Sequence, residues 1–169
     1  PAILKLWYAI SDAVWACIQH PENDTPVWKV RGIEIDRRKS WLRIRLPSGR
    51  YLCYPNIRIR PRKKVWKDAE GNETIEWRDT ICYDGVDPFK KYWGTVETYH
   101  GKLIENIVQA ASRDVFAHGM KAAEAEGANI VLHVHDELIA EVPDTPNWPV
   151  ATLEWCMCQH PDWAVGLPL

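Results

Sequence analysis

The chain has 169 residues, of which 46% are hydrophobic and 26% are charged, and these ordinary values exclude a disordered or low-complexity protein. No stretch approaches the roughly 18 consecutive apolar residues of a membrane span, so we expect no membrane partner. A net charge of −2 hides an asymmetry, because residues 1–103 carry 19 basic and 13 acidic side chains while residues 104–169 carry 2 and 10. The basic excess is concentrated between Arg37 and Lys67, a stretch without one acid, which predicts a surface that faces a polyanion.

The five cysteines are odd in number and form no C-x-x-C pair. This pattern indicates free thiols in a reducing compartment and argues against a disulfide framework or a zinc site. The sequence begins with Pro1 and has no basic segment before an apolar one, so we expect no signal peptide and a chain cut from a longer protein. The expected location is the cytoplasm.

Residues 2–19 show the apolar spacing of an amphipathic helix. The residues expected on its apolar face are Ile3, Trp7, Ile10, Val14, Cys17 and Ile18. The pairs His20-Pro21 and Asn23-Asp24 are expected to end this helix.

From Val27 to Tyr83 the apolar pattern changes to a period of two residues, which predicts antiparallel strands. Strands are expected at 27–31, 33–35, 41–46, 51–54, 57–60, 65–67, 74–77 and 81–83, with hairpin turns at 47–50 and 68–72. We expect one ribbon sheet that is basic on one side and aromatic and aliphatic on the other. Its tryptophans either stack on bases or, the interpretation we favour, cover the sheet; they are Trp28, Trp41, Trp66 and Trp77.

The C-terminal part begins with a glycine-containing connector and then changes to helical spacing. The expected elements are a connector at 84–101, a long helix at 102–126 closed by Gly127, a buried strand at 128–135, its return at 138–142, a loop at 143–149 and a short helix at 150–159. Strands as apolar as these two are expected to pack on a core.

An acidic pair, Asp136 and Glu137, separates these two strands and follows His135. Carboxylates at such a junction are costly to desolvate unless they face solvent, a cation or a basic partner. The tip is therefore either a platform for Mg²⁺, with hard oxygen ligands on a rigid support, or a polar hairpin turn. His133 and His135 face the same side of a strand, which would suit zinc, although no third ligand lies near them in sequence.

The long helix before this hairpin has two different faces when its residues are projected at about 100° per residue. One stripe carries the long donors Lys102, Asn106, Gln109 and Arg113. The opposite, apolar face carries Ile104, Ile107, Val108, Ala111 and Val115. The donors either follow the sugar and phosphate edges of a nucleic-acid groove or form a solvated helix face.

The segment LIENIVQAASRDVF, followed by VLHVHDELIAEV, resembles the C-terminal palm of family A DNA polymerases, and phage-encoded members most of all. The segments LPSGRYLCYP and HPDWAVGLPL also resemble phage members. The resemblance implies that Asp136, in motif C, is one of two carboxylates that hold a catalytic Mg²⁺ pair. It also implies that Glu137 assists at this site, that His135 lies by the primer end and that Gln109 contacts the DNA minor groove.

The chain departs from the family pattern at several positions. The family commonly has an Arg eight residues before the Gln and an Asn four before it, whereas this chain has Gly101 and Glu105 there. Lys102 and Asn106 lie one residue later, and we interpret them as substitutes. The family's second metal-binding Asp, in motif A, and its nucleotide-holding fingers helix match no segment of the 169 residues.

We therefore expect an α+β fold for residues 1–169, a single C-terminal palm fragment. A small antiparallel palm-like sheet, backed by the long helix and carrying motif C, is expected in residues 96–169. A basic antiparallel β-ribbon inserted at residues 20–95 is expected to hold the duplex backbone through Arg58, Arg60 and Arg62.

The function that the resemblance implies is DNA-directed DNA synthesis with Mg²⁺, by nucleotidyl transfer to a primer 3′-hydroxyl in a bacterial or phage-infected cell. Its partners are primer–template DNA and, in the longer protein, deoxynucleoside triphosphates. The alternative is a non-catalytic nucleic-acid-binding β-ribbon module with a merely structural acidic hairpin. A third reading combines the two, as a polymerase fragment that binds DNA and is inactive alone.

Overall fold

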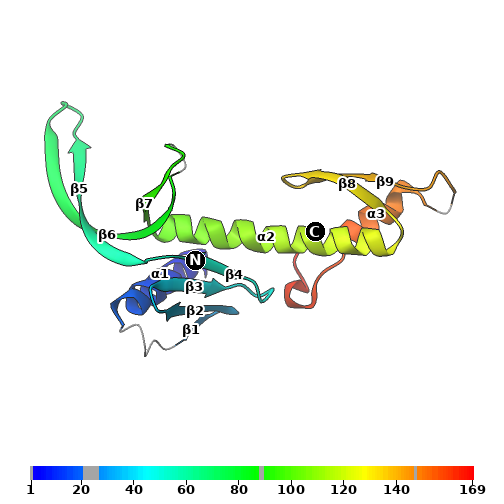
Figure 1. Cartoon of the computed structure of the whole chain (residues 1–169), viewed down its shortest axis with the longest axis horizontal. Coiled ribbons are helices and arrows are strands. Elements are labelled where there is room, and N and C mark those ends of the chain that lie inside the picture. Colours follow the sequence, from blue (N-terminus) through cyan, green and yellow to red (C-terminus); the bar gives the residue numbers. More distant parts are fainter. Residues whose placement is uncertain (1, 21–26, 88–89, 147) are drawn as a thin grey trace. The chain divides into compact units, whose positions relative to one another are not determined.

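The computed structural model describes residues 2–20, 27–87, 90–146 and 148–169, and it has an α+β fold with antiparallel sheets, which confirms the expected fold class. The elements, shown in Figure 1, are α1 (Ala2–Gln19), β1 (Trp28–Val30), β2 (Ile33–Arg38), β3 (Trp41–Arg45), β4 (Tyr51–Tyr54), β5 (Arg58–Lys67), β6 (Glu73–Val86), β7 (Trp93–Thr98), α2 (His100–Ala125), β8 (Asn129–Val134), β9 (Glu137–Glu141), α3 (Val150–Met157) and the 3₁₀ turn η1 (Asp162–Ala164). None of the described helices is both long and apolar enough to cross a membrane.

The chain divides into two compact units, and helix α2 contributes to both. Unit 1 is Pro1–Ile107 and unit 2 is Val108–Leu169.

Unit 1 contains a four-stranded antiparallel sheet in the order β1-β2-β3-β4, with α1 packed on one face. The most deeply buried side chains of this layer include Ile10, Val14 and Cys17 of α1 and Ile35, Leu42 and Ile44 of the sheet. The expected helix is confirmed, but Ile3, which we expected on the apolar face, is 71% exposed. The expected stop signals at Pro21, Asn23 and Asp24 lie outside the described residues.

Arg37, a residue of β2, caps the C-terminus of α1. Arg37 Nη1 donates to the carbonyl oxygens of Ile18, at 2.9 Å, and His20, at 3.3 Å. The last carbonyls of a helix have no partner within the helix, so this side chain satisfies two acceptors there.

Unit 1 also contains a second, three-stranded sheet in the order β5-β6-β7, so the expectation of one ribbon sheet through residue 83 is wrong. The expected connector at 84–101 is also wrong in part, because it contains the end of β6 and all of β7. Gly85 and Gly94, which suggested a linker, pair directly across these strands. A Cβ at Gly85 would lie 2.9 Å from the Tyr83 ring, so a neighbouring aromatic ring occupies the space that the glycine leaves.

Unit 2 is built around the second half of α2, which ends as the sequence predicts. Gly127 has a φ of +96°, its N–H donates to Glu124 O, and the N–H of Ala128 donates to Ala123 O. This is the Schellman arrangement, in which a left-handed glycine follows the helix and satisfies its last carbonyls. Ala128 then enters the small core with Ala123 and Cys156.

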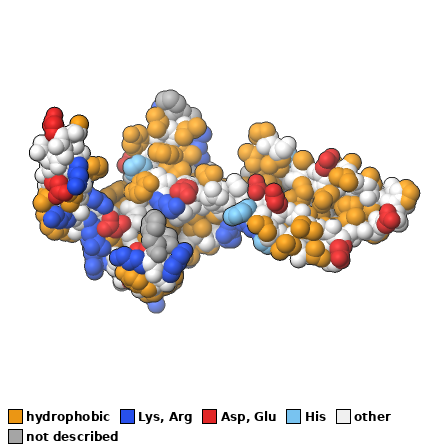
Figure 2. Space-filling model, turned by 90° about the horizontal axis from the view of Figure 1, so that it is seen from above, with side chains coloured by type: hydrophobic (Ala, Val, Ile, Leu, Met, Phe, Trp, Pro, Cys, Tyr) orange, Lys and Arg blue, Asp and Glu red, His pale blue; other side chains and the backbone are white. Residues whose placement is uncertain are grey.

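The expected strands at 128–135 and 138–142 are confirmed as the hairpin β8–β9, but our expectation that they pack on a core holds for one face only. Ala140 packs on the small core, while Leu132, Val134 and Ile139 are more than half exposed. Hydrophobic side chains accordingly cover much of this part of the molecule in Figure 2. Val108, expected on the apolar face of α2, is also 57% exposed.

Candidate functional site

The acidic pair lies at a tight hairpin turn, as the sequence predicts. Val134 pairs with Glu137, so His135 and Asp136 are the two turn residues. His135 has a φ of +54°, in the left-handed region that two-residue hairpin turns require. The ladder on both sides of the turn therefore fixes where the Asp136 carboxylate projects.

An open cleft of about 510 Å³ lies between the second half of α2 and this hairpin. Its lining residues are Gln109, Ser112, Arg113 and Phe116 of α2 and His133, His135 and Asp136 of the hairpin. Four residues that the sequence singled out thus line one cleft. They are Gln109 and Arg113 of the helix and His135 and Asp136 of the turn.

Arg113 connects the helix to the hairpin. Its guanidinium donates to the ring of His133, with Nη2 3.1 Å from Nε2, and it lies over the Phe116 ring, 5.1 Å from the ring centre. A cation held by a ring face and an imidazole has a restricted orientation. The Arg113 side chain lines the cleft, and its Nη1 donates to Met120 Sδ at 3.9 Å. This arrangement suits an anionic or hydrogen-bond-accepting ligand.

The carboxylate of Asp136 has no hydrogen bond or ion pair with any residue that the structure describes, and the side chain is exposed. Glu137 is exposed as well and begins β9, but it does not line the cleft. Within the described parts of the chain, no three His, Cys, Asp or Glu side chains form a metal-binding group. The hairpin therefore offers one hard oxygen ligand at the cleft, which fits part of a Mg²⁺ site, and a complete site needs a further carboxylate.

Two other residues of the predicted donor stripe belong to unit 1 and make contacts there. Lys102 Nζ lies 3.0 Å from a carboxylate oxygen of Glu105. Asn106 Nδ2 donates to the hydroxyl of Tyr54 at 3.0 Å, and burial raises the pKa of this tyrosine. The structure does not bring Lys102 and Asn106 into the cleft that holds Gln109 and Arg113.

The three arginines predicted to hold DNA through the ribbon differ from one another. Arg58 donates to Asn56 O at 2.6 Å, Asp84 Oδ1 at 2.8 Å and Thr95 Oγ1 at 2.6 Å, so it ties together the strands of the second sheet. Hydrogen bonds from Asn56 and then Arg58 hold the pKa of the Asp84 carboxyl below its usual value.

Arg62 forms an ion pair with Glu97 at 3.2 Å, and Lys64 Nζ lies 2.8 Å from the same carboxylate. Arg60 is exposed and has no ion pair with a described residue. Acids that are distant in sequence thus neutralise much of the apparently acid-free block, and of the three arginines Arg60 is the one whose charge remains available.

Three residues that line the cleft were not predicted to do so from the sequence. Ser112 and Phe116 had no expected functional role, and His133 was considered only as a zinc ligand. Ser112 lies three residues after Gln109, and this spacing on a helix would have placed both on one face. The orientation of Arg113 toward His133 depends on the hairpin folding back along the helix, and spacing alone does not show this.

The fold and the cleft define an α+β chain with an exposed carboxylate at a hairpin tip beside a donor-bearing helix. Over 167 residues, 99% of its length, the chain is 34% identical to the DNA polymerase of Bacillus phage SP02. It is therefore related in sequence to a phage DNA polymerase, of which it spans 23% of the length. No protein-family model matches the chain, and no solved structure matches it either.

Proposed function

We propose that residues 1–169 are the C-terminal palm part of a DNA-directed DNA polymerase of family A, with motif C at the β8–β9 hairpin. In this proposal residues 96–169 form the palm core and residues 20–95 are an inserted ribbon. The observation that carries it is the Asp136 carboxylate, which has no partner among the described residues and lies at a tight hairpin turn in one cleft with Gln109, Arg113 and His135. The similarity to a phage DNA polymerase supports the same assignment.

Asp136 is the proposed metal ligand. Mg²⁺, when bound, would neutralise charge on the reacting phosphate and orient it. Because the described residues supply one carboxylate at the cleft, the second is expected from a part of the polymerase outside these 169 residues. Glu137 is proposed to support the site from the first position of β9.

The reaction in the complete polymerase joins a primer to a nucleotide. The oxygen of the primer 3′-hydroxyl forms a bond to the α-phosphorus, the bond from this phosphorus to the bridging oxygen breaks, and pyrophosphate leaves. The hydroxyl proton is lost to a base or to water. In this chain His135 is proposed to position the primer end, and Gln109 and Arg113 to hold sugar and phosphate edges.

The structure narrows the set of proposed DNA contacts. Lys102, Asn106, Arg58 and Arg62 have partners within unit 1, so their contacts to DNA would require those partners to be exchanged. Arg60 is the ribbon cation that can meet a duplex phosphate without such an exchange.

The alternative function is a nucleic-acid-binding module without catalysis. It is favoured by the lack of a metal-binding group among the described residues. Both functions predict that residues 1–169 alone bind DNA and do not extend a primer, since a single carboxylate holds a divalent ion weakly and the family's nucleotide-holding fingers helix matches no segment of the sequence. Templated incorporation by the purified chain would contradict both.

The experiment that separates them uses the full-length polymerase that contains this chain. Asp136→Asn keeps the size of the side chain and removes its charge, so we expect incorporation to fall by about 10²–10³-fold with DNA affinity retained. The matched control is Glu141→Gln, an exposed acid of β9 that does not line the cleft and should leave the rate unchanged. A near wild-type rate for Asp136→Asn would end the motif C assignment.

A further inference from the structure

The positive charge of the chain is not spread evenly over the two sheets of unit 1. Residues 28–54, the β1–β4 sheet with its turns, carry 8 basic and 2 acidic side chains, a net charge of +6. Residues 58–98, the β5–β7 sheet with its turns, carry 9 basic and 8 acidic side chains, a net charge of +1. Of the two sheets of unit 1, the first therefore attracts a polyanion more strongly, and it contains Arg43 and Arg45 of the basic block.

The face of this sheet opposite α1 carries exposed cations and aromatic rings around the buried Asp36 carboxylate. The strand registers place its residues in rows, with Lys29, Glu34, Arg45 and Tyr51 in one, Asp36 and Arg43 in the next, and Arg38 and Trp41 in the third. Trp41 is 46% and Tyr51 is 43% exposed. We name this surface, with its six cationic and aromatic residues Lys29, Arg38, Trp41, Arg43, Arg45 and Tyr51, the outer face.

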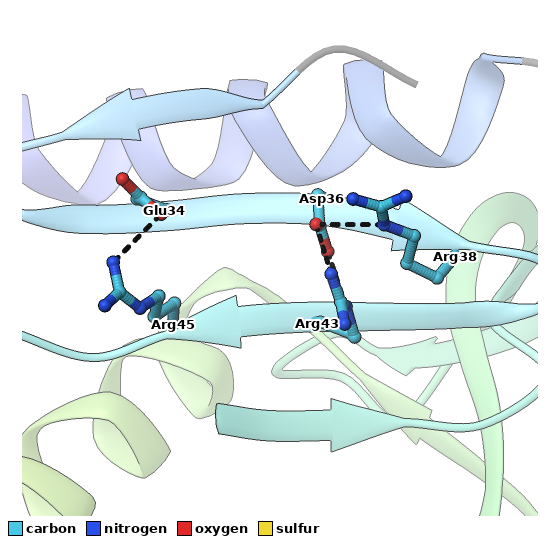
Figure 3. A network of polar contacts seen from close by, with 5 residues as sticks. All are labelled: Glu34, Asp36, Arg38, Arg43 and Arg45. Carbon is cyan, nitrogen blue, oxygen red and sulfur yellow. Dashed lines mark hydrogen bonds and ion pairs between the residues drawn. The ribbon is translucent and has the colours of Figure 1, made fainter. Parts of the chain in front are cut away.

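Two acids orient the cations of the outer face without neutralising them all. The Asp36 carboxylate accepts from Arg43 Nε at 2.8 Å and Nη2 at 2.5 Å and lies 3.6 Å from Arg38, as Figure 3 shows. Glu34 lies 3.3 Å from both Lys29 and Arg45. Four cations thus share two carboxylates, and the side chains of Arg38 and Arg45 remain 70% and 45% exposed.

The aromatic rings extend the same surface. The Arg43 guanidinium lies over the Tyr51 ring, 4.9 Å from its centre, and Trp41 stands opposite Arg38 in the register. Flat exposed rings beside oriented cations are the combination that binds bases by stacking and phosphates by charge.

The dimensions of the outer face favour a single strand over a duplex groove. Four strands about 4.8 Å apart place the axes of the outer two about 14 Å from each other. The major groove of B-DNA is about 12 Å wide and admits a helix or a two-stranded ribbon. A four-stranded surface that is wider than this groove instead suits a strand whose bases are unpaired and can lie on the rings.

We propose that the outer face of the β1–β4 sheet is a binding site for single-stranded nucleic acid, distinct from the cleft at Asp136. Phosphates pair with Arg38, Arg45 and Lys29, and bases stack on Trp41 and Tyr51. The site binds without regard to sequence, because both interactions are common to all nucleotides. It does not depend on the motif C assignment, since none of its residues lies in the cleft.

The test measures binding to the complete chain of residues 1–169 by fluorescence anisotropy. The probes are a labelled single DNA strand of about 12 nucleotides, the RNA of the same sequence and the corresponding DNA duplex. We expect both single strands to bind with similar affinity and more tightly than the duplex, with an affinity that falls as salt rises.

The decisive variant is Arg38→Gln/Trp41→Ala/Arg45→Gln, in which Asp36 keeps Arg43 and Glu34 keeps Lys29. Single-strand affinity should fall by about tenfold or more, and the salt slope should fall by about 1.4 for the two lost phosphate contacts. The matched control, Lys63→Gln/Lys67→Gln/Trp77→Ala, removes as many cations and one exposed tryptophan from the β5–β6 hairpin. It should weaken single-strand binding by no more than about twofold to threefold.

Equal losses in the two variants, no loss in the first, or tighter binding of the duplex would each overturn the proposal. Thermal melting shows whether the variants fold. Lys29→Gln/Arg38→Gln, at side chains that are 72% and 70% exposed, is a milder substitution that must also weaken binding. Asp136→Asn should not weaken single-strand binding, which separates a failure of this proposal from a failure of the proposed polymerase function.

Discussion

Two aspartates at antiparallel strands show how differently this chain uses its carboxylates. Asp36, on β2, is 7% exposed and accepts two hydrogen bonds from Arg43. Asp136, at the β8–β9 turn, is exposed and has no hydrogen bond or ion pair with a described residue.

Both aspartates lie on antiparallel hairpins, so their position does not distinguish them. What distinguishes them is whether the carboxylate has a partner within the fold. A buried carboxylate with a bidentate arginine is fully engaged inside the fold and contributes to stability and to the orientation of that arginine. An exposed carboxylate at a hairpin turn, without a described partner, contributes little to folding and can meet a ligand, as we propose for Asp136.

The largest effect on stability is expected from Arg43→Gln. This substitution leaves the Asp36 carboxylate buried with only the more distant Arg38, which should lower the free energy of unfolding by about 2–4 kcal/mol. Urea unfolding of the purified chain measures it. The Arg45→Gln variant, at a partly exposed ion pair with Glu34, is the matched control and should change stability by less than about 1 kcal/mol. Equal effects of the two substitutions would remove the distinction between buried and exposed pairs.

A smaller effect is expected when Arg58 is replaced. Arg58→Gln loses the hydrogen bonds that join Asn56, Asp84 and Thr95, so we expect a loss of about 1–2 kcal/mol in the free energy of unfolding. Arg60→Gln, two residues along the same strand face, removes a side chain without a described ion pair and should cost less than about 0.5 kcal/mol. If Arg60→Gln were the more destabilising of the two, Arg58 would not have the bracing role that its contacts indicate.

The smallest effect is a difference in acid sensitivity. The hydrogen bonds from Arg43 hold the pKa of Asp36 below its usual value, so the carboxylate stabilises the fold fully above about pH 4, the unfolded-state pKa. This contribution disappears as the pH falls through the lower pKa of the folded state. The melting temperature of the wild-type chain should therefore drop more between pH 5 and pH 2 than that of Arg43→Gln. Parallel curves for the two proteins would contradict this assignment, and Arg60→Gln should follow the wild type.

Part of this fold follows directly from local sequence. Alternating strands on both sides of Pro47-Ser48-Gly49-Arg50 predict the β3–β4 hairpin, and the two strands pair antiparallel as expected. The end of α2 at Gly127 and the hairpin turn at Asp136 were predicted for the same reason, since turn and cap residues act within a few positions. Helical spacing also predicted that Gln109 and Arg113 share a face, and the cleft contains both.

Other features depend on contacts between distant residues and could not be predicted from spacing. Arg58 meets Asp84 and Thr95, which lie 26 and 37 residues away, so an arginine from an acid-free block becomes a structural brace. Strand β7 was missed because Gly94 suggests a linker until its pairing with Gly85 is known. The exposed face of β8–β9 could not be predicted. A run of apolar residues indicates a strand that can be buried, but it does not show whether other elements cover both of its faces.

The central claim is that Asp136 serves synthesis while Asp36 serves stability, and one paired measurement tests it most directly. Asp136→Asn and Asp36→Asn are made separately in the longer polymerase that our proposal implies, and the incorporation rate per folded molecule and the melting temperature are measured for each. We predict that Asp136→Asn loses nearly all synthesis at an unchanged melting temperature, whereas Asp36→Asn lowers the melting temperature and keeps its rate. A rate for Asp136→Asn close to that of the wild type would contradict the account.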